Sequence, residues 1–97
     1  MKINNSYELV KEIIFEINPL NDLEYFTARI YKVLPNSILS EDYCWDLNHY
    51  FQDQKDIDPY VPTGRYGNSI LVCENQIQSY INRFKNPIGY IKIDFKG

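Results

Sequence analysis

Carboxylates, aromatic rings and the only histidine of the chain are concentrated in residues 40–60, SEDYCWDLNHYFQDQKDIDPY. Six acidic side chains against one lysine give this stretch a net charge of −5, whereas the whole chain carries −3. Carboxylates and an imidazole can bind a metal ion, transfer a proton, or offer negative charge to a basic partner. The spacing of these residues, and the elements that carry them, decide among the three.

A metal site would have to begin with Asp46, His49 and Asp53, which share one face if the segment is helical. An Asp-x-x-His pair can supply two ligands to zinc or another transition metal. Further ligands would have to come from a distant segment, because the chain has one histidine and its two cysteines lie far apart. A small metal-binding protein around His49 is therefore only an alternative, and we expect neither a bound metal nor another cofactor.

His49 is also the only candidate for general acid–base chemistry at neutral pH, and Asp46 could orient it. No serine, threonine or cysteine stands in a nucleophile-elbow or catalytic-cysteine motif. We therefore expect no enzymatic activity.

The sequence GRYG at residues 64–67 precedes a predicted helix, and two kinds of nucleotide-binding loop begin in this way. A P-loop also requires a preceding strand and a following Lys-Ser/Thr, and a KH-type RNA-binding domain requires strands that we do not predict. The chain has ten basic against thirteen acidic residues, without a basic and aromatic stripe. We therefore expect no direct binding of nucleic acid.

Four segments show the three- and four-residue spacing of apolar side chains that is typical of amphipathic helices. They cover residues 6–17, 21–34, 40–54 and 68–85, and each begins near an Asn or Ser that can cap a helix. Proline-containing pairs end the first, second and fourth. The sequence therefore predicts a mainly α fold, a four-helix bundle-like single domain of 97 residues with an extended C-terminal strand or tail.

The C-terminal strand is predicted at residues 88–95, where Ile91, Ile93 and Phe95 alternate with polar side chains. It could cross the bundle as an extended tail, pair with residues 1–5, or pair with a strand of a partner chain.

No run approaches the roughly 18 apolar residues that span a bilayer, so we expect a cytoplasmic protein that does not contact a membrane. Cys44 and Cys73 lack the CxxC spacing of a zinc or redox site, and both fall on apolar helical stripes. We expect two buried thiols.

In the predicted third helix, one face packs against the core and the other carries a row of acids that the following loop continues. A focused negative patch attracts a basic partner, and aromatic side chains supply the area that holds a complex together. Nucleases are a natural partner, because they must attract phosphate. The predicted partner-binding residues are Asp42, Trp45, Asp46, His49, Asp53, Asp56, Asp58, Tyr60 and Tyr66.

The segment DLNHYFQDQKDIDPYVP follows the predicted helical hairpin and holds a set of apolar, acidic and aromatic residues: Leu47, Phe51, Asp56, Asp58 and Tyr60. It resembles colicin D-type immunity proteins, in which a helix ends in an acidic, tyrosine-containing loop, and more broadly the immunity proteins encoded beside contact-dependent growth inhibition toxins. The resemblance covers about residues 23–84, and the IGYIKIDF tail departs from it. It implies a cytoplasmic protein that binds and neutralises a toxin, often a tRNA-cleaving nuclease.

We therefore expect an immunity protein or antitoxin that blocks a cognate basic nuclease toxin through the acidic helix and loop. The alternative is a phage-type inhibitor that mimics nucleic acid and binds a host enzyme through the same face.

Overall fold

The computed structural model describes residues 1–95, and strands form most of its regular structure. Strands β1 (Tyr7–Leu20) and β2 (Leu23–Val33) form a long antiparallel hairpin, and β3 (Tyr43–Leu47) and β5 (Tyr66–Gly67) extend it into a four-stranded sheet in the order β1-β2-β3-β5. Strands β4 (His49–Gln52) and β6 (Gly89–Lys92) form a second, two-stranded sheet.

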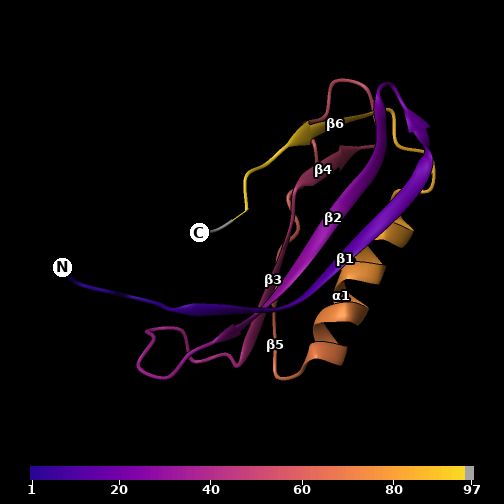
Figure 1. Cartoon of the computed structure of the whole chain (residues 1–97). Helices are drawn as coiled ribbons and strands as arrows, with labels where there is room; N and C mark the ends of the chain where they lie inside the picture. Colours follow the sequence, from indigo (N-terminus) through magenta and orange to yellow (C-terminus); the bar gives the residue numbers. More distant parts are fainter. Residues whose placement is uncertain (96–97) are drawn as a thin grey trace.

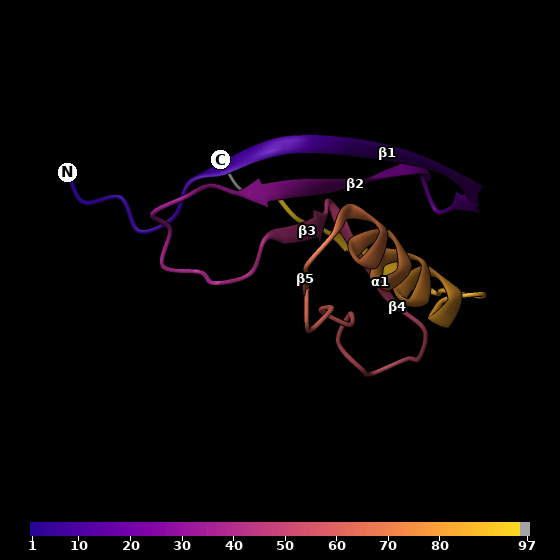
Figure 2. The same ribbon diagram turned by 90° about the horizontal axis from the view of Figure 1, so that it is seen from below.

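Helix α1 (Ile70–Arg83) lies along one face of the larger sheet, as Figures 1 and 2 show from two directions. Within residues 1–95 it is the only helix. The predicted mainly α, four-helix bundle-like fold is therefore wrong, and so are the predicted helices at residues 6–17, 21–34 and 40–54.

The first two predicted helices are strands because their apolar side chains also alternate. In β2, Phe26, Ala28 and Ile30 are buried at every second position, which places them on one face of a strand. In β1, Ile13 is half-buried and Ile14 is 65% exposed, although both fit the stripe of a helix. Valine and isoleucine are abundant here, and β-branched side chains favour strands.

Asn21 and Asp22 form the turn of the hairpin rather than the start of a helix, since Leu20 pairs with Leu23. Asn21 has a φ of 53°, a left-handed conformation that asparagine tolerates better than most residues. Two-residue hairpin turns of this kind favour Asn, Asp and Gly because of this preference. A helix-capping pattern and a hairpin turn thus use the same residues.

The segment of the third predicted helix instead forms two strands, β3 and β4, which are separated by Asn48. The main-chain N–H of Asn48 donates to Thr27 O at 3.1 Å, and its side-chain Oδ1 accepts from Thr27 N at 2.8 Å. Its carbonyl oxygen accepts from Ile93 N at 2.8 Å. Asn48 thus bonds to Thr27 of β2 on one side and to Ile93, just after β6, on the other. It marks the point where the pairing changes, since β3 pairs with β2 and β4 pairs with β6.

The predicted helix at residues 68–85 is confirmed as α1. The Ser69 hydroxyl caps it by accepting from Val72 N at 3.1 Å, and Asn86-Pro87 follow its end. Its buried stripe packs on the sheet and consists of Cys73, Ile77, Tyr80 and, just past the helix, Phe84.

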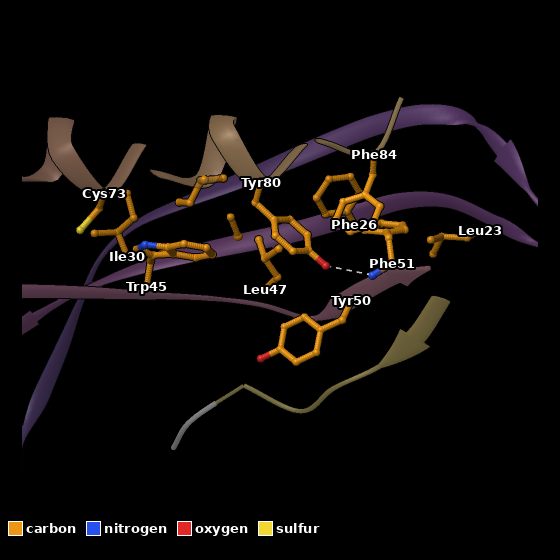
Figure 3. Close-up of a cluster of buried hydrophobic side chains, with 12 residues drawn as sticks. Leu23, Phe26, Ile30, Trp45, Leu47, Tyr50, Phe51, Cys73, Tyr80 and Phe84 are labelled. Carbon is orange, nitrogen blue, oxygen red and sulfur yellow. Dashed lines mark hydrogen bonds between the residues drawn. The ribbon is translucent and has the colours of Figure 1, made fainter. Parts of the chain in front are cut away.

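The main core lies between α1 and the sheet, and Figure 3 shows its aromatic part. The Phe26 ring meets the Phe51 ring edge-on at 5.0 Å, and the Tyr80 and Phe84 rings lie 4.9 Å apart. The Tyr80 hydroxyl accepts from Phe51 N at 3.0 Å and donates to Tyr60 O at 2.7 Å. Helix, strand β4 and the following loop are therefore joined through one side chain.

The predicted C-terminal strand is present as β6, and its partner is β4, which the sequence did not suggest. The N-terminal residues instead bond to the connection after β2, where Ile38 N donates to Asn4 O at 2.9 Å and Leu34 N donates to Ser6 O at 2.9 Å. Cys44 and Cys73 are both buried thiols, as predicted, although Cys44 lies on β3 rather than on a helix. In the part of the chain described, no helix is long and apolar enough to cross a bilayer.

Candidate functional site

The predicted partner-binding residues do not form one face, because they lie on strands and loops at different depths. Asp46 is 4% exposed and its carboxylate is used by the fold. Its Oδ1 atom lies 2.9 Å from Arg65 Nη1 and accepts from the Tyr50 hydroxyl at 2.8 Å and from Leu47 N at 2.9 Å. A carboxylate this enclosed offers little to a partner.

Trp45 is also buried, on the side of β3 that faces α1. Its indole Nε1 donates to Gln76 Oε1 at 2.8 Å, so its polar atom is satisfied within the fold. Trp45 therefore packs the core and does not flank a row of acids.

His49 is buried at the start of β4, where its ring meets the Tyr90 ring edge-on at 5.4 Å and its Nδ1 lies 2.9 Å from Asn48 Oδ1. Burial lowers the pKa of His49, and the charge of Lys92, opposite it on β6, lowers the pKa further. At neutral pH His49 is therefore an uncharged packing residue. Within residues 1–95, no group of three or more His, Cys, Asp or Glu side chains could hold a metal ion.

Two other predicted residues are accessible but stand apart. Asp42 is exposed just before β3, and its carbonyl oxygen accepts from Val33 N at 2.9 Å. Tyr66 on β5 is 37% exposed, and its carbonyl oxygen accepts from Gln76 Nε2 at 2.8 Å. The connection that contains Asp42 lies at the opposite end of the molecule from the hairpin turn (Figure 1).

The remaining predicted acids come together in residues 53–58, which we call the acidic loop. It projects after β4, with every residue exposed, and contains one lysine, Lys55, among three carboxylates: Asp53, Asp56 and Asp58. At its tip Ile57 is 53% exposed, so an apolar side chain stands among the carboxylates. Exposed carboxylates of this kind can attract a basic surface, and Ile57 offers apolar area among them.

The stem of the acidic loop is held in place by Gln52, which sequence reasoning missed. Its Nε2 donates to Gln54 O at 3.1 Å and to Ile57 O at 2.6 Å, across the loop. Its carbonyl oxygen accepts from Ile88 N at 2.7 Å, which ties the loop to the segment before β6. Gly89 leaves room for this side chain, because a Cβ there would lie 2.9 Å from Gln52 Oε1.

Two further features fix the shape of the loop. Asp56 has a φ of 65°, which aspartate tolerates better than β-branched residues. Tyr60, after the loop, donates its N–H to Phe51 O at 2.8 Å, and the Arg83 guanidinium lies 4.0 Å from the centre of its ring. The contact between Arg83 and Tyr60 joins the end of α1 to the chain that follows the acidic loop.

The geometry places three carboxylates and an exposed apolar side chain on a loop that Gln52 holds in shape, and this arrangement can bind a protein surface. Comparison of the chain with models of known families, with curated proteins and with solved structures finds no significant match.

Proposed function

We propose that this chain is an immunity protein or antitoxin that binds and neutralises a basic protein toxin, with the acidic loop as its main contact surface. The observation that carries the proposal is the exposed group Asp53, Asp56 and Asp58 around Ile57, on a stem that Gln52 holds. A nuclease domain is a suitable partner, because its phosphate-binding cleft is basic. We place this activity in the cytoplasm, where a nuclease toxin meets substrates such as tRNA.

The charge of the loop accelerates the encounter with a basic surface, and Ile57 supplies apolar area at its centre. A loop that already has its bound shape loses less conformational entropy on binding, so more of the contact energy contributes to affinity. The helix implied by the resemblance to colicin D-type immunity proteins is wrong, because residues 43–47 and 49–52 lie in strands. The acidic loop follows these strands, and Tyr60 comes two residues after it.

The test uses the toxin candidate encoded beside this chain. The triple variant Asp53→Lys, Asp56→Lys, Asp58→Lys should lose protection in bacteria and slow association with the toxin by roughly tenfold or more at low salt. Asp42→Lys is a control for charge reversal at an exposed acid, since the connection that contains Asp42 lies away from the acidic loop (Figure 1). Full protection by the triple variant would refute the proposed surface.

The nucleic-acid mimic has less support, because the predicted row of acids is not present within residues 1–95: Asp46 is buried, and the connection that contains Asp42 lies away from the acidic loop (Figure 1). A metal-binding protein around His49 has no ligand set among residues 1–95.

A further inference from the structure

A cleft of about 430 Å³ opens at the end of the core where the hairpin turn meets the end of α1. Its walls are mostly apolar and include Ile17, Leu20, Phe26, Phe51, Ile81 and Phe84. Figure 3 shows Phe26, Phe51 and Phe84 gathered at this end of the core. Ligand pockets in proteins commonly have volumes of roughly 300 to 1,000 Å³, so this cleft has room for a large side chain.

Carboxylates flank the cleft on the side of the hairpin. A neighbouring hollow shares residues 17–19 with the cleft and is also lined by Glu16 and Glu24. Both glutamates are exposed. Lys85 is the cationic residue among the lining residues of the cleft.

The acidic loop stands close by. Phe51 lines the cleft, and the next residue, Gln52, holds the acidic loop. The carbonyl oxygen of Gln52 also accepts from the N–H of Ile88, which follows the lining residue Pro87. The hairpin turn, the end of α1 and the acidic loop lie toward the same end of the molecule (Figures 1 and 2). The cleft is thus flanked by Glu16 and Glu24 on the side of the hairpin, and the acidic loop begins two residues after its lining residue Phe51.

We infer that this cleft receives an apolar side chain, aromatic or large aliphatic, from a basic segment of the protein partner. The inference rests on the proposed function and adds an anchor to it: the carboxylates attract the basic segment, and the cleft holds the apolar side chain. Charge complementarity favours this occupant over a second copy of this chain, which would bring its own acids to the same place.

The test uses the whole chain and a synthetic peptide, blocked at both ends, in which lysines surround one phenylalanine. When this phenylalanine peptide is added, the amide NMR signals of residues in the cleft walls should shift, and the shifts should reach a plateau as the peptide concentration rises. A peptide with serine in place of phenylalanine should bind roughly tenfold more weakly, and one with glutamate in place of lysine should not bind.

Variants of the chain separate charge from shape. The double variant Glu16→Lys, Glu24→Lys should weaken binding of the phenylalanine peptide by roughly tenfold, whereas Glu8→Lys, Glu41→Lys, which reverses exposed acids away from the cleft, should not. A spectrum of well-dispersed signals confirms that each variant is folded. Leu20→Trp, which fills the cleft, should weaken the phenylalanine peptide more than the serine peptide.

Three results would overturn the inference: no saturable shift in the cleft walls, equal binding of the phenylalanine and serine peptides, or binding of decanoate in the cleft without binding of the basic peptide. A concentration-dependent dimer that buries the cleft would also overturn it. If protection against the toxin survives Glu16→Lys, Glu24→Lys but not reversal of the acidic loop, the proposed function stands and the anchor is refuted.

Discussion

The Asp46 carboxylate lies 2.9 Å from the Arg65 guanidinium, and this ion pair joins β3 to the segment before β5. The same Arg65 Nη1 atom lies 2.8 Å from the Tyr50 hydroxyl, and the Arg65 carbonyl oxygen accepts from Trp45 N at 3.0 Å. The long connection between β4 and β5 is therefore fixed at both ends, by Gln52 at its start and by Arg65 at its finish.

Replacing Asp46 should destabilise the fold while leaving the charge of the acidic loop unchanged. Asp46→Asn removes the negative charge that Arg65 faces, and we expect unfolding to become easier by roughly 2 to 4 kcal/mol in urea titrations. Asp42→Asn makes the same change at an exposed site and should alter stability by about 0.5 kcal/mol or less. Equal effects of the two substitutions would show that the buried pair does not stabilise the fold.

Alkaline solution should destabilise the protein through Tyr50 and Tyr80. Burial raises the pKa of both hydroxyls to about 12, and the hydrogen bond to Asp46 adds to the shift for Tyr50. In the unfolded chain a tyrosine has a pKa of about 10, so the folded state holds these protons more tightly. The stability that this difference contributes is complete below about pH 10 and is lost as the pH rises toward about 12.

Urea titrations at a series of pH values between these limits measure the effect. Tyr50→Phe and Tyr80→Phe should each make the loss of stability with pH shallower, compared with Tyr25→Phe at a half-exposed ring. A slope identical in all three variants would assign the alkaline loss to other groups.

Mild acid should destabilise the protein through His49. Its pKa is lowered in the folded state by burial and then by Lys92, so folding favours the neutral ring. The stability from this shift is present above about pH 6.5, the usual histidine value, and is lost as the pH falls toward the folded pKa. Because the chain has one histidine, its imidazole signals in NMR give that pKa directly. A midpoint at or above the usual value would contradict the prediction, and Lys92→Gln should move the midpoint upward.

Helix α1 was predicted correctly because residues close together in the sequence determine where it forms. In α1, the Ser69 cap, the stripe of Cys73, Ile77 and Tyr80, and the proline after the helix all act within a few residues of one another. The hairpin is different, because β1 and β2 are stabilised by pairs such as Phe15 with Phe26, which lie on separate segments. An apolar spacing that fits both the helical period and the two-residue period of a strand cannot show which segment pairs with which. In β1 and β2, only the many β-branched side chains favoured strands over helices.

The positions predicted for the candidate residues were likewise correct where they rested on local signals and wrong where they rested on the third predicted helix. Asp56 and Asp58 were expected in a loop, where Asp58-Pro59 interrupts any regular pattern, and Asp53 was expected on the last turn of the third predicted helix; all three are exposed in the loop after β4. Asp46 and His49 were placed beside them only through the spacing of a helix that does not exist. Gln52 was missed, because its side chain bonds to the carbonyl oxygens of Gln54 and Ile57 in an irregular loop whose shape no sequence pattern predicts.

The role of Gln52 leads to a prediction that separates the shape of the acidic loop from its charge. Gln52→Ala removes the side-chain hydrogen bonds to Gln54 O and Ile57 O and leaves every carboxylate in place. The loop should then sample more conformations, and the affinity for the toxin should fall by roughly tenfold, which corresponds to about 1.4 kcal/mol. Because the charge is unchanged, the dependence of the association rate on salt should stay as in the parent chain.

Surface binding kinetics at several salt concentrations provide the measurement, with Gln78→Ala as the control. Gln78 is an exposed glutamine on α1 whose Nε2 donates to Asn82 Oδ1 at 2.9 Å, away from the acidic loop. Its replacement should change neither affinity nor salt dependence. If Gln52→Ala binds the toxin as tightly as Gln78→Ala does, the loop does not need a fixed shape, and the carboxylates and Ile57 act as a flexible surface instead.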